Sequence, residues 1–103
     1  MKMLNIVCGE KLEEEILALF NELGIKGYTV ISGVGGSGQT GTVSGTGGWT
    51  DRNKLFMVVL EDEHIHMTQV LNAVRGIHAR HVHSYRGLNI PLRVFLQPCE
   101  VIL

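Results

Sequence analysis

A glycine-rich stretch constrains the fold of this chain more than any other feature. From Gly33 to Gly48, eight of sixteen residues are glycine and only two are apolar. Glycine loses more backbone freedom on folding than any other residue, so ordering this stretch is costly and we expect it to be mobile until a ligand binds. A connection of this length is unusual inside a compact domain. We predict one domain over residues 1–103, in which residues 33–53 form a flexible loop.

The residues before this loop predict a strand, a helix and a second strand. Residues 3–8 are mainly apolar, and residues 27–31 are rich in strand-forming types. Between them, residues 10–23 predict a helix, because their apolar side chains fall on one helical face. Gly24 follows directly and is expected to end this helix. The apolar residues of that face are Leu12, Ile16, Leu19, Phe20 and Leu23.

The residues after the loop predict a strand over 54–60, a helix from Asp62 to about His78 and a last strand over 91–103. The order βαββαβ is that of the ferredoxin-like α+β fold, a four-stranded antiparallel sheet with two helices on one face. The apolar side chains of the strands cannot all face the helices, so the open face needs a cover. We therefore expect an oligomer. The residues concerned are Val30, Met57, Val59 and Phe95.

Composition excludes several classes of function. A net charge of −1 gives no general attraction to nucleic acid. No apolar run approaches the ~20 residues that span a bilayer, and no signal-peptide pattern is present, so we expect a cytoplasmic protein without membrane insertion. Cys8 and Cys99 have no zinc-site spacing and are expected as reduced thiols. No residues match a catalytic motif, which predicts a protein that is not an enzyme.

The chemistry of the loop and of the C-terminal half points to an anion. The loop offers backbone N–H groups and hydroxyls that can wrap a phosphate. It matches neither a P-loop, because no lysine follows the glycines, nor a dinucleotide fingerprint, because a strand follows it. Residues 64–99 lack Asp and Glu but hold four arginines and all five histidines. Trp49 is expected to dock on a partner, a ligand or its own sheet, since an aromatic side chain in a polar loop favours burial.

Residues 22–41, ELGIKGYTVISGVGGSGQTG, resemble the signature of the PII signal-transduction proteins. Ser37 stands where that family has a later glycine. The third strand, Glu61-Asp62 and the closing VFLQPCEVI continue the likeness. The positions that match in register are Gly24, Ile25, Gly27, Thr29, Val30, Gly35, Gln39 and Gly41.

The resemblance implies a homotrimer that binds adenine nucleotide in clefts between neighbouring subunits. The glycine-rich loop would be the family's T-loop, which changes shape with ligand and docks on a membrane transporter or an enzyme. No obligatory cofactor is implied. By position, the nucleotide-binding residues would be Thr29, Gly35, Gly36, Ser37, Gly38, Gln39, Arg86, Gly87 and Asn89. The partner-binding residues of the T-loop would be Thr42, Ser44, Trp49 and Arg52.

The chain departs from the family at positions that carry positive charge. Gly38 replaces a basic residue at the start of the T-loop, and Gly9 replaces the lysine after the first strand. The phosphate-binding pattern TGxxGxGK is replaced in part by Tyr85–Pro91, and no C-terminal arginine segment follows. Charge-assisted contacts dominate phosphate recognition. These losses therefore favour a less charged nucleotide than ATP as the effector, such as ADP, AMP or a cyclic nucleotide, or a different small anion such as bicarbonate, alone or with the nucleotide.

Five histidines keep a second interpretation open, a trimeric protein that binds a divalent metal ion and acts in metal homeostasis. His81 and His83 would point the same way on an extended chain. A threefold axis would then bring three copies of one histidine together, the number of ligands that a zinc site needs.

Overall fold

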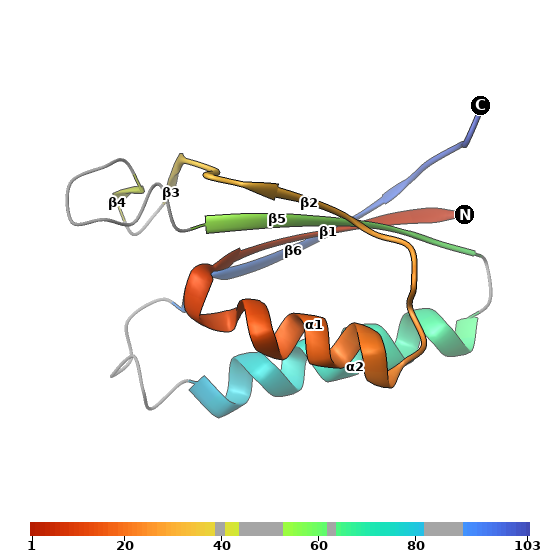
Figure 1. Ribbon diagram of the computed structural model, residues 1–103, viewed down its shortest axis with the longest axis horizontal. Helices are drawn as coiled ribbons and strands as arrows, with labels where there is room; N and C mark the ends of the chain where they lie inside the picture. Colours follow the sequence, from red (N-terminus) through yellow and green to blue (C-terminus); the bar gives the residue numbers. More distant parts are fainter. Residues whose placement is uncertain (39–40, 44–52, 62–63, 82–89) are drawn as a thin grey trace.

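The architecture is a four-stranded antiparallel sheet with two helices on one face (Figure 1). The computed structural model describes residues 1–38, 41–43, 53–61, 64–81 and 90–103. The sheet has the order β2-β5-β1-β6, and β3 and β4 form a separate two-stranded ribbon. The predicted ferredoxin-like arrangement is confirmed. The elements are β1 (Lys2–Gly9), the 3₁₀ turn η1 (Glu10–Leu12), α1 (Glu13–Glu22), β2 (Thr29–Ser32), β3 (Gly36–Gly38), β4 (Gly41–Val43), β5 (Asn53–Leu60), α2 (His64–His81) and β6 (Leu92–Pro98).

The core lies between the sheet and the helices. Four of the five apolar residues predicted for the α1 face are buried, and the fifth, Leu23, packs against them. Phe20 of α1 meets Phe56 of β5 edge to face, with ring centroids 5.7 Å apart. Aromatic pairs in this geometry add attraction beyond their burial. The Tyr28 ring lies 5.1 Å from that of Phe20 and closes this side of the core.

The ends of the helices follow local chemistry. Gly24 has a φ of 73°, and Ile25 donates a 2.8 Å hydrogen bond to the Phe20 carbonyl. Glycine adopts this left-handed conformation without strain, so the predicted stop of α1 is confirmed. The predicted first helix starts with a 3₁₀ turn before α1 begins at Glu13. The second helix, α2, continues to His81 at its C-terminal end, past the predicted end at about His78.

The last strand is shorter than predicted, and this expectation was wrong. β6 ends at Pro98, whereas the apolar pattern predicted a strand to Leu103. Pro98 pairs with Lys2, the first residue of β1, so the chain beyond it has no neighbouring strand to follow. One further bond remains, from the Cys99 N–H to the Met1 carbonyl at 3.3 Å.

The open face of the sheet carries apolar side chains. Residues directly opposite in an antiparallel pair share a face. Met57 and Phe95 both lie opposite Asn5, on its two sides, and Val59 lies opposite Met3. Phe95 is 56% exposed and Val59 41% exposed. Val30, in contrast, lies opposite the buried Phe56 and belongs to the helix side.

In the part of the chain that the structure describes, no helix combines the length and apolar character needed to cross a membrane.

The two cysteines, Cys8 and Cys99, are both free thiols. They lie toward opposite ends of the β1–β6 pair, because Cys8 pairs with Leu92 while Lys2 pairs with Pro98. About six residues of strand, roughly 20 Å, separate these ends, too far for a disulfide within one chain.

Candidate functional site

The two long connections of the chain join the sheet at the same end (Figure 1). The glycine-rich insertion leaves β2 after Ser32 and returns at Asn53, and the connection between α2 and β6 leaves after His81. We call this the loop end of the sheet. Ligand-binding residues concentrate on loops held by a rigid scaffold, so this end is the candidate site.

Backbone hydrogen bonds hold the strands together at the loop end. The N–H groups of Gly33 and Val34 donate to the Asn53 carbonyl at 3.0 and 3.2 Å, and Gly33 has a φ of 73°. The Gly9 N–H donates to the Pro91 carbonyl at 2.8 Å. A β-carbon at position 9 would lie 3.1 Å from Cγ of Pro91, so Pro91 would have to move by a few tenths of an ångström to admit a side chain there.

Lys54 supplies a positive charge at this end. Its Nζ donates a 3.0 Å hydrogen bond to Oγ of Ser32 and lies 3.4 Å from Oε2 of Glu13. The side chain is 23% exposed. The sequence interpretation missed this residue. A usable signal was present, because Lys54 shares its strand parity with Phe56 and Val58 and therefore points to the helix side of the sheet.

The buried thiol of Cys8 lies next to this group but is not activated. Burial raises the pKa of the Cys8 thiol to about 11, and the negative charge of Glu13 acts in the same direction while Lys54 opposes it. The thiol is therefore protonated at neutral pH. A cysteine nucleophile reacts as the thiolate, so Cys8 is suited to packing rather than to attack on a substrate.

A cluster of three charged or titratable side chains holds the end of α2 against α1. Oε2 of Glu15 accepts a 3.1 Å hydrogen bond from Arg80, and Oε1 of Glu15 lies 2.5 Å from Nε2 of His81. Burial opposes ionisation of Glu15, but the bonds from His81 and Arg80 outweigh it and lower the pKa of this carboxyl. The cluster anchors the residue from which the α2–β6 connection starts.

This cluster predicts a stability change with pH. Because the pKa of Glu15 is lower in the folded chain, the ionised carboxylate stabilises the fold above its ordinary pKa of about 4.5, and the effect disappears as the pH falls through the folded value. Thermal unfolding should show Glu15→Gln below the parent at pH 7, by no more than about 1 kcal/mol as for other half-exposed ion pairs. The difference should shrink as the pH falls below 4.5. The exposed neighbour Glu14, changed to glutamine, is the control, and an equal loss in both variants would contradict the assignment.

The structure places some of the predicted site residues and not others. Thr29 is exposed on the open face opposite Met57, three residues along β2 from Ser32, or about 10 Å. Gly35 is exposed, and Gly36, Ser37 and Gly38 form β3, in which Ser37 pairs with Thr42 of β4. The predicted residues that lie outside the described part are Gln39, Ser44, Trp49, Arg52, His83, Arg86, Gly87 and Asn89.

The metal interpretation rests on His81 and His83, and of these two the structure describes His81. Within residues 1–38, 41–43, 53–61, 64–81 and 90–103, no group of three or more His, Cys, Asp or Glu side chains could hold a metal ion. His81 and Arg80 both contact the carboxylate of Glu15, so a cation lies on the same carboxylate as the His81 ring.

The sheet order and the insertion between β2 and β5 define a ferredoxin-like α+β protein with a long loop at one end. The family model for the nitrogen regulatory protein P-II matches residues 1–89, and the chain belongs to that family. It is a PII-like regulatory protein. The search of curated proteins finds no match.

Solved structures of a PII-like protein have the same fold. CPII from Thiomonas intermedia K12, a nitrogen regulatory PII-like protein bound to ADP, AMP and bicarbonate, superposes with a TM-score of 0.71 at 18% identity. The alignment covers 93% of this chain and 82% of that one. CPII bound to ADP and bicarbonate gives a TM-score of 0.70 at 20% identity, with the same coverage. The apo form gives 0.64 at 19%, covering 93% of this chain and 85% of that chain.

Proposed function

We propose that this chain is a sensor of a small adenine nucleotide, ADP or AMP, with bicarbonate as a second ligand, and that it regulates a membrane transporter or enzyme through residues 33–53. The observation that carries the proposal is the convergence of both long connections at the loop end, where Lys54 is held by Ser32 and Glu13. CPII, which shares the fold, is described as bound to ADP, AMP and bicarbonate.

The charge at the loop end favours a ligand with few phosphates. Glu13 already offsets part of the positive charge of Lys54, because the two groups lie 3.4 Å apart. Gly9 and Gly38 contribute no cation where the family has basic residues. A triphosphate needs several charge-assisted contacts, whereas a diphosphate or monophosphate needs fewer. Among the glycines of this segment, Gly33 donates its N–H to Asn53, whereas Gly35 precedes β3 and offers its backbone N–H as a neutral donor for such an anion.

We propose that the working form is a homotrimer with the ligand in clefts between subunits. The support is the open face of the sheet, which exposes Val59 and Phe95 where a soluble monomer would carry polar side chains. A cyclic assembly of three sheets would bury this face and bring the loop end of each subunit beside its neighbour. The protein is proposed to act by binding rather than by catalysis.

Ligand-dependent stability tests the proposal. Thermal unfolding of the full chain should shift upward with ADP or AMP, since a ligand at 100 times its Kd stabilises the fold by about 2.7 kcal/mol. ATP at equal concentration should give a smaller shift, and bicarbonate should increase the ADP shift. Lys54→Met should weaken ADP binding about tenfold in calorimetry, because it removes the cation at the loop end.

Lys26→Met is the matched control, because Lys26 is an exposed lysine in the α1–β2 connection, at the end of the sheet opposite the loop end (Figure 1). It should bind ADP as the parent does. Absence of stabilisation by ADP, AMP and ATP, with or without bicarbonate, would refute the nucleotide proposal. Equal ADP binding by the Lys54 and Lys26 variants would refute the proposed role of Lys54 and leave the nucleotide proposal itself intact.

A further inference from the structure

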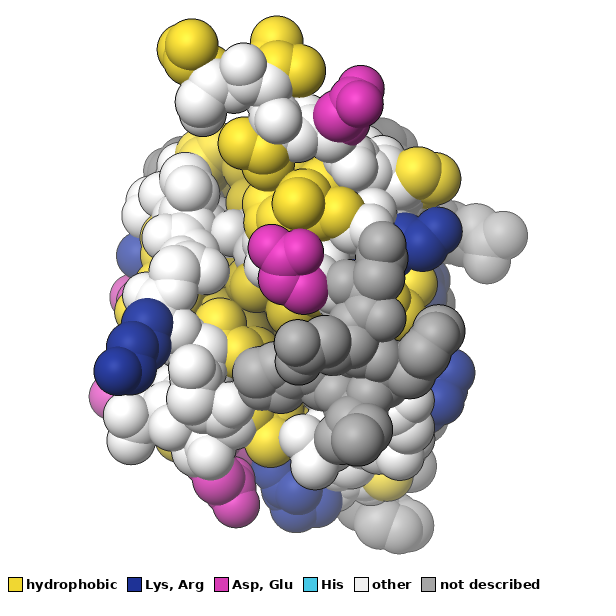
Figure 2. Space-filling view, turned by 90° about the vertical axis from the view of Figure 1, so that its right-hand side faces the viewer, with side chains coloured by type: hydrophobic (Ala, Val, Ile, Leu, Met, Phe, Trp, Pro, Cys, Tyr) yellow, Lys and Arg dark blue, Asp and Glu magenta, His cyan; other side chains and the backbone are white. Residues whose placement is uncertain are grey.

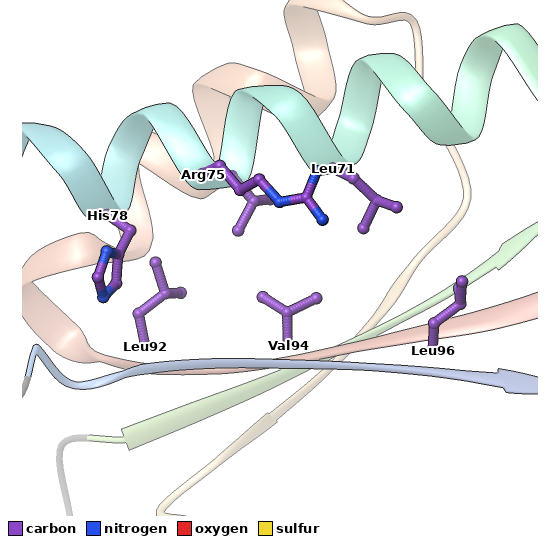
Figure 3. A pocket seen from close by; sticks show the side chains of 7 residues that line it. Leu71, Arg75, His78, Leu92, Val94 and Leu96 are labelled. Atoms are coloured by element: carbon purple, nitrogen blue, oxygen red, sulfur yellow. The ribbon is translucent and has the colours of Figure 1, made fainter.

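An apolar groove runs between α2 and the edge strand β6 (Figure 3). Leu92, Val94 and Leu96 point from β6 toward the helix, and Arg75 and His78 of α2 lie above them. The cavity has a volume of about 360 Å³. Its lining is completed by Leu71 and Val74. Apolar walls with a cationic rim suit an apolar segment that carries a negative charge.

The strand beside this groove is open to pairing. β6 lies at the edge of the sheet and pairs with β1 alone among the described strands. One row of its backbone groups is thus available to another extended segment. Both faces of the edge are apolar, because Leu96 is 41% exposed on the helix side and Phe95 is 56% exposed on the open face.

The segment that follows β6 has the complementary character. Val101, Ile102 and Leu103 are all exposed, at 59% for Val101 and 87% for Ile102. The segment projects away from the sheet (Figure 1), and Figure 2 shows apolar side chains at the top of that end of the molecule with an apolar patch beneath them. Consecutive apolar residues without alternation are typical of a strand that is buried on both faces.

We propose that residues 100–103 of one copy add as a strand to the β6 edge of a second copy, so that apolar side chains fill the α2–β6 groove on one side and cover Phe95 on the other. Strand addition supplies backbone hydrogen bonds and places alternate side chains in the groove. The inference rests on the assembly part of the proposed function and not on the ligand. A tail-to-groove contact is heterologous, and three such contacts can close a ring.

Charge favours the same occupant. Glu100 directly precedes the apolar residues, whereas the sequence of α2 and of β6 contains no Asp or Glu. Arg75 at the rim of the groove has no ion-pair partner among the described residues. A second copy would therefore bring a carboxylate toward a cation at the rim of the groove.

The other edge of the sheet is a poorer fit. β2 also exposes Val30 and Ile31, but the helix side of that edge is already filled. The Tyr28 ring lies 5.1 Å from Phe20 and 6.2 Å from Phe56 and covers the core on the helix side of that edge. The β6 edge is thus the one that combines apolar faces, a cavity and positive charge.

Disulfide trapping between two differently tagged chains tests the contact. Both chains carry Cys99→Ser, while the buried Cys8 with its pKa of about 11 is left in place. One chain carries Ile102→Cys, and the other carries Phe95→Cys or Leu96→Cys. Mild oxidation of the mixture should link the two chains, as shown by mass spectrometry. The matched control, Ile102→Cys mixed with Ile31→Cys, should give at least tenfold less product. No product from either β6 position, or a stronger product with position 31, would overturn the proposal.

A second measurement separates this inference from nucleotide sensing. Ile102→Lys and Leu96→Lys should each raise the dissociation constant of the assembly about tenfold or more, and the double variant should not add the two effects, because they break one contact. Circular dichroism checks that each variant is folded. Trapping at β6 without stabilisation by ADP would support the strand addition and refute the nucleotide proposal. Stabilisation by ADP without trapping would support nucleotide binding and refute the strand addition.

Discussion

Replacing Phe56 with alanine is expected to lower the free energy of unfolding by about 3–5 kcal/mol. Phe56 is fully buried in β5, and its ring meets Phe20 edge to face at 5.7 Å and Tyr28 at 6.2 Å. Truncation removes the apolar transfer energy and both ring contacts, and it leaves a cavity that the sheet cannot close. Urea unfolding followed by circular dichroism measures the change.

Phe95→Ala is the matched control for this prediction. The same ring is removed from the open face, where it is 56% exposed and has no described ring partner. At concentrations low enough to hold the chain as a monomer, the loss should stay below about 1 kcal/mol. Equal losses at positions 56 and 95 would show that the core does not lie between the helices and the sheet.

A charge on the open face is expected to dissociate the assembly. Val59 lies on β5, inside the sheet, and its side chain is 41% exposed on the face opposite the helices. Burial of an unpaired lysine at an apolar interface costs several kcal/mol, so Val59→Lys should prevent the sheets from packing together. Light scattering after size exclusion should change from three times the chain mass of 11.4 kDa to that mass alone.

Glu14→Lys is the control, since Glu14 is exposed on α1, away from the open face. It makes a similar surface change and should leave the assembly intact. Assembly of the Val59 variant at the parent's mass would contradict an interface on this face. A parent chain that runs as a monomer at all concentrations would contradict the trimer itself.

Elements that depend on short-range pattern could be predicted. The buried face of α1 and its stop at Gly24 follow from residues within one or two turns of each other, and both are confirmed. The strand and helix order follows in the same way, because a period of two or of 3.6 is a local property. The match to the P-II family over residues 1–89 agrees with the resemblance seen from residue 22 onward.

Features that depend on partners far along the chain could not be predicted. The end of β6 depends on where β1 starts, since Pro98 is the partner of Lys2. The position of Val30 on the helix side depends on its register with Phe56. Lys54 gained a role only because the fold brings Ser32 and Glu13 to it.

The sequence by itself determined the fold class, the place of the glycine-rich insertion and the family, since periodicity, glycine content and motif spacing are properties of neighbouring residues. Only the tertiary structure decided that Lys54 lies at the base of that insertion, that His81 is held by Glu15, and that an apolar groove remains open beside β6. The physical reason is register. A shift of one residue between two strands exchanges every side chain between the faces, and no local pattern sets that pairing over a distance of ninety residues.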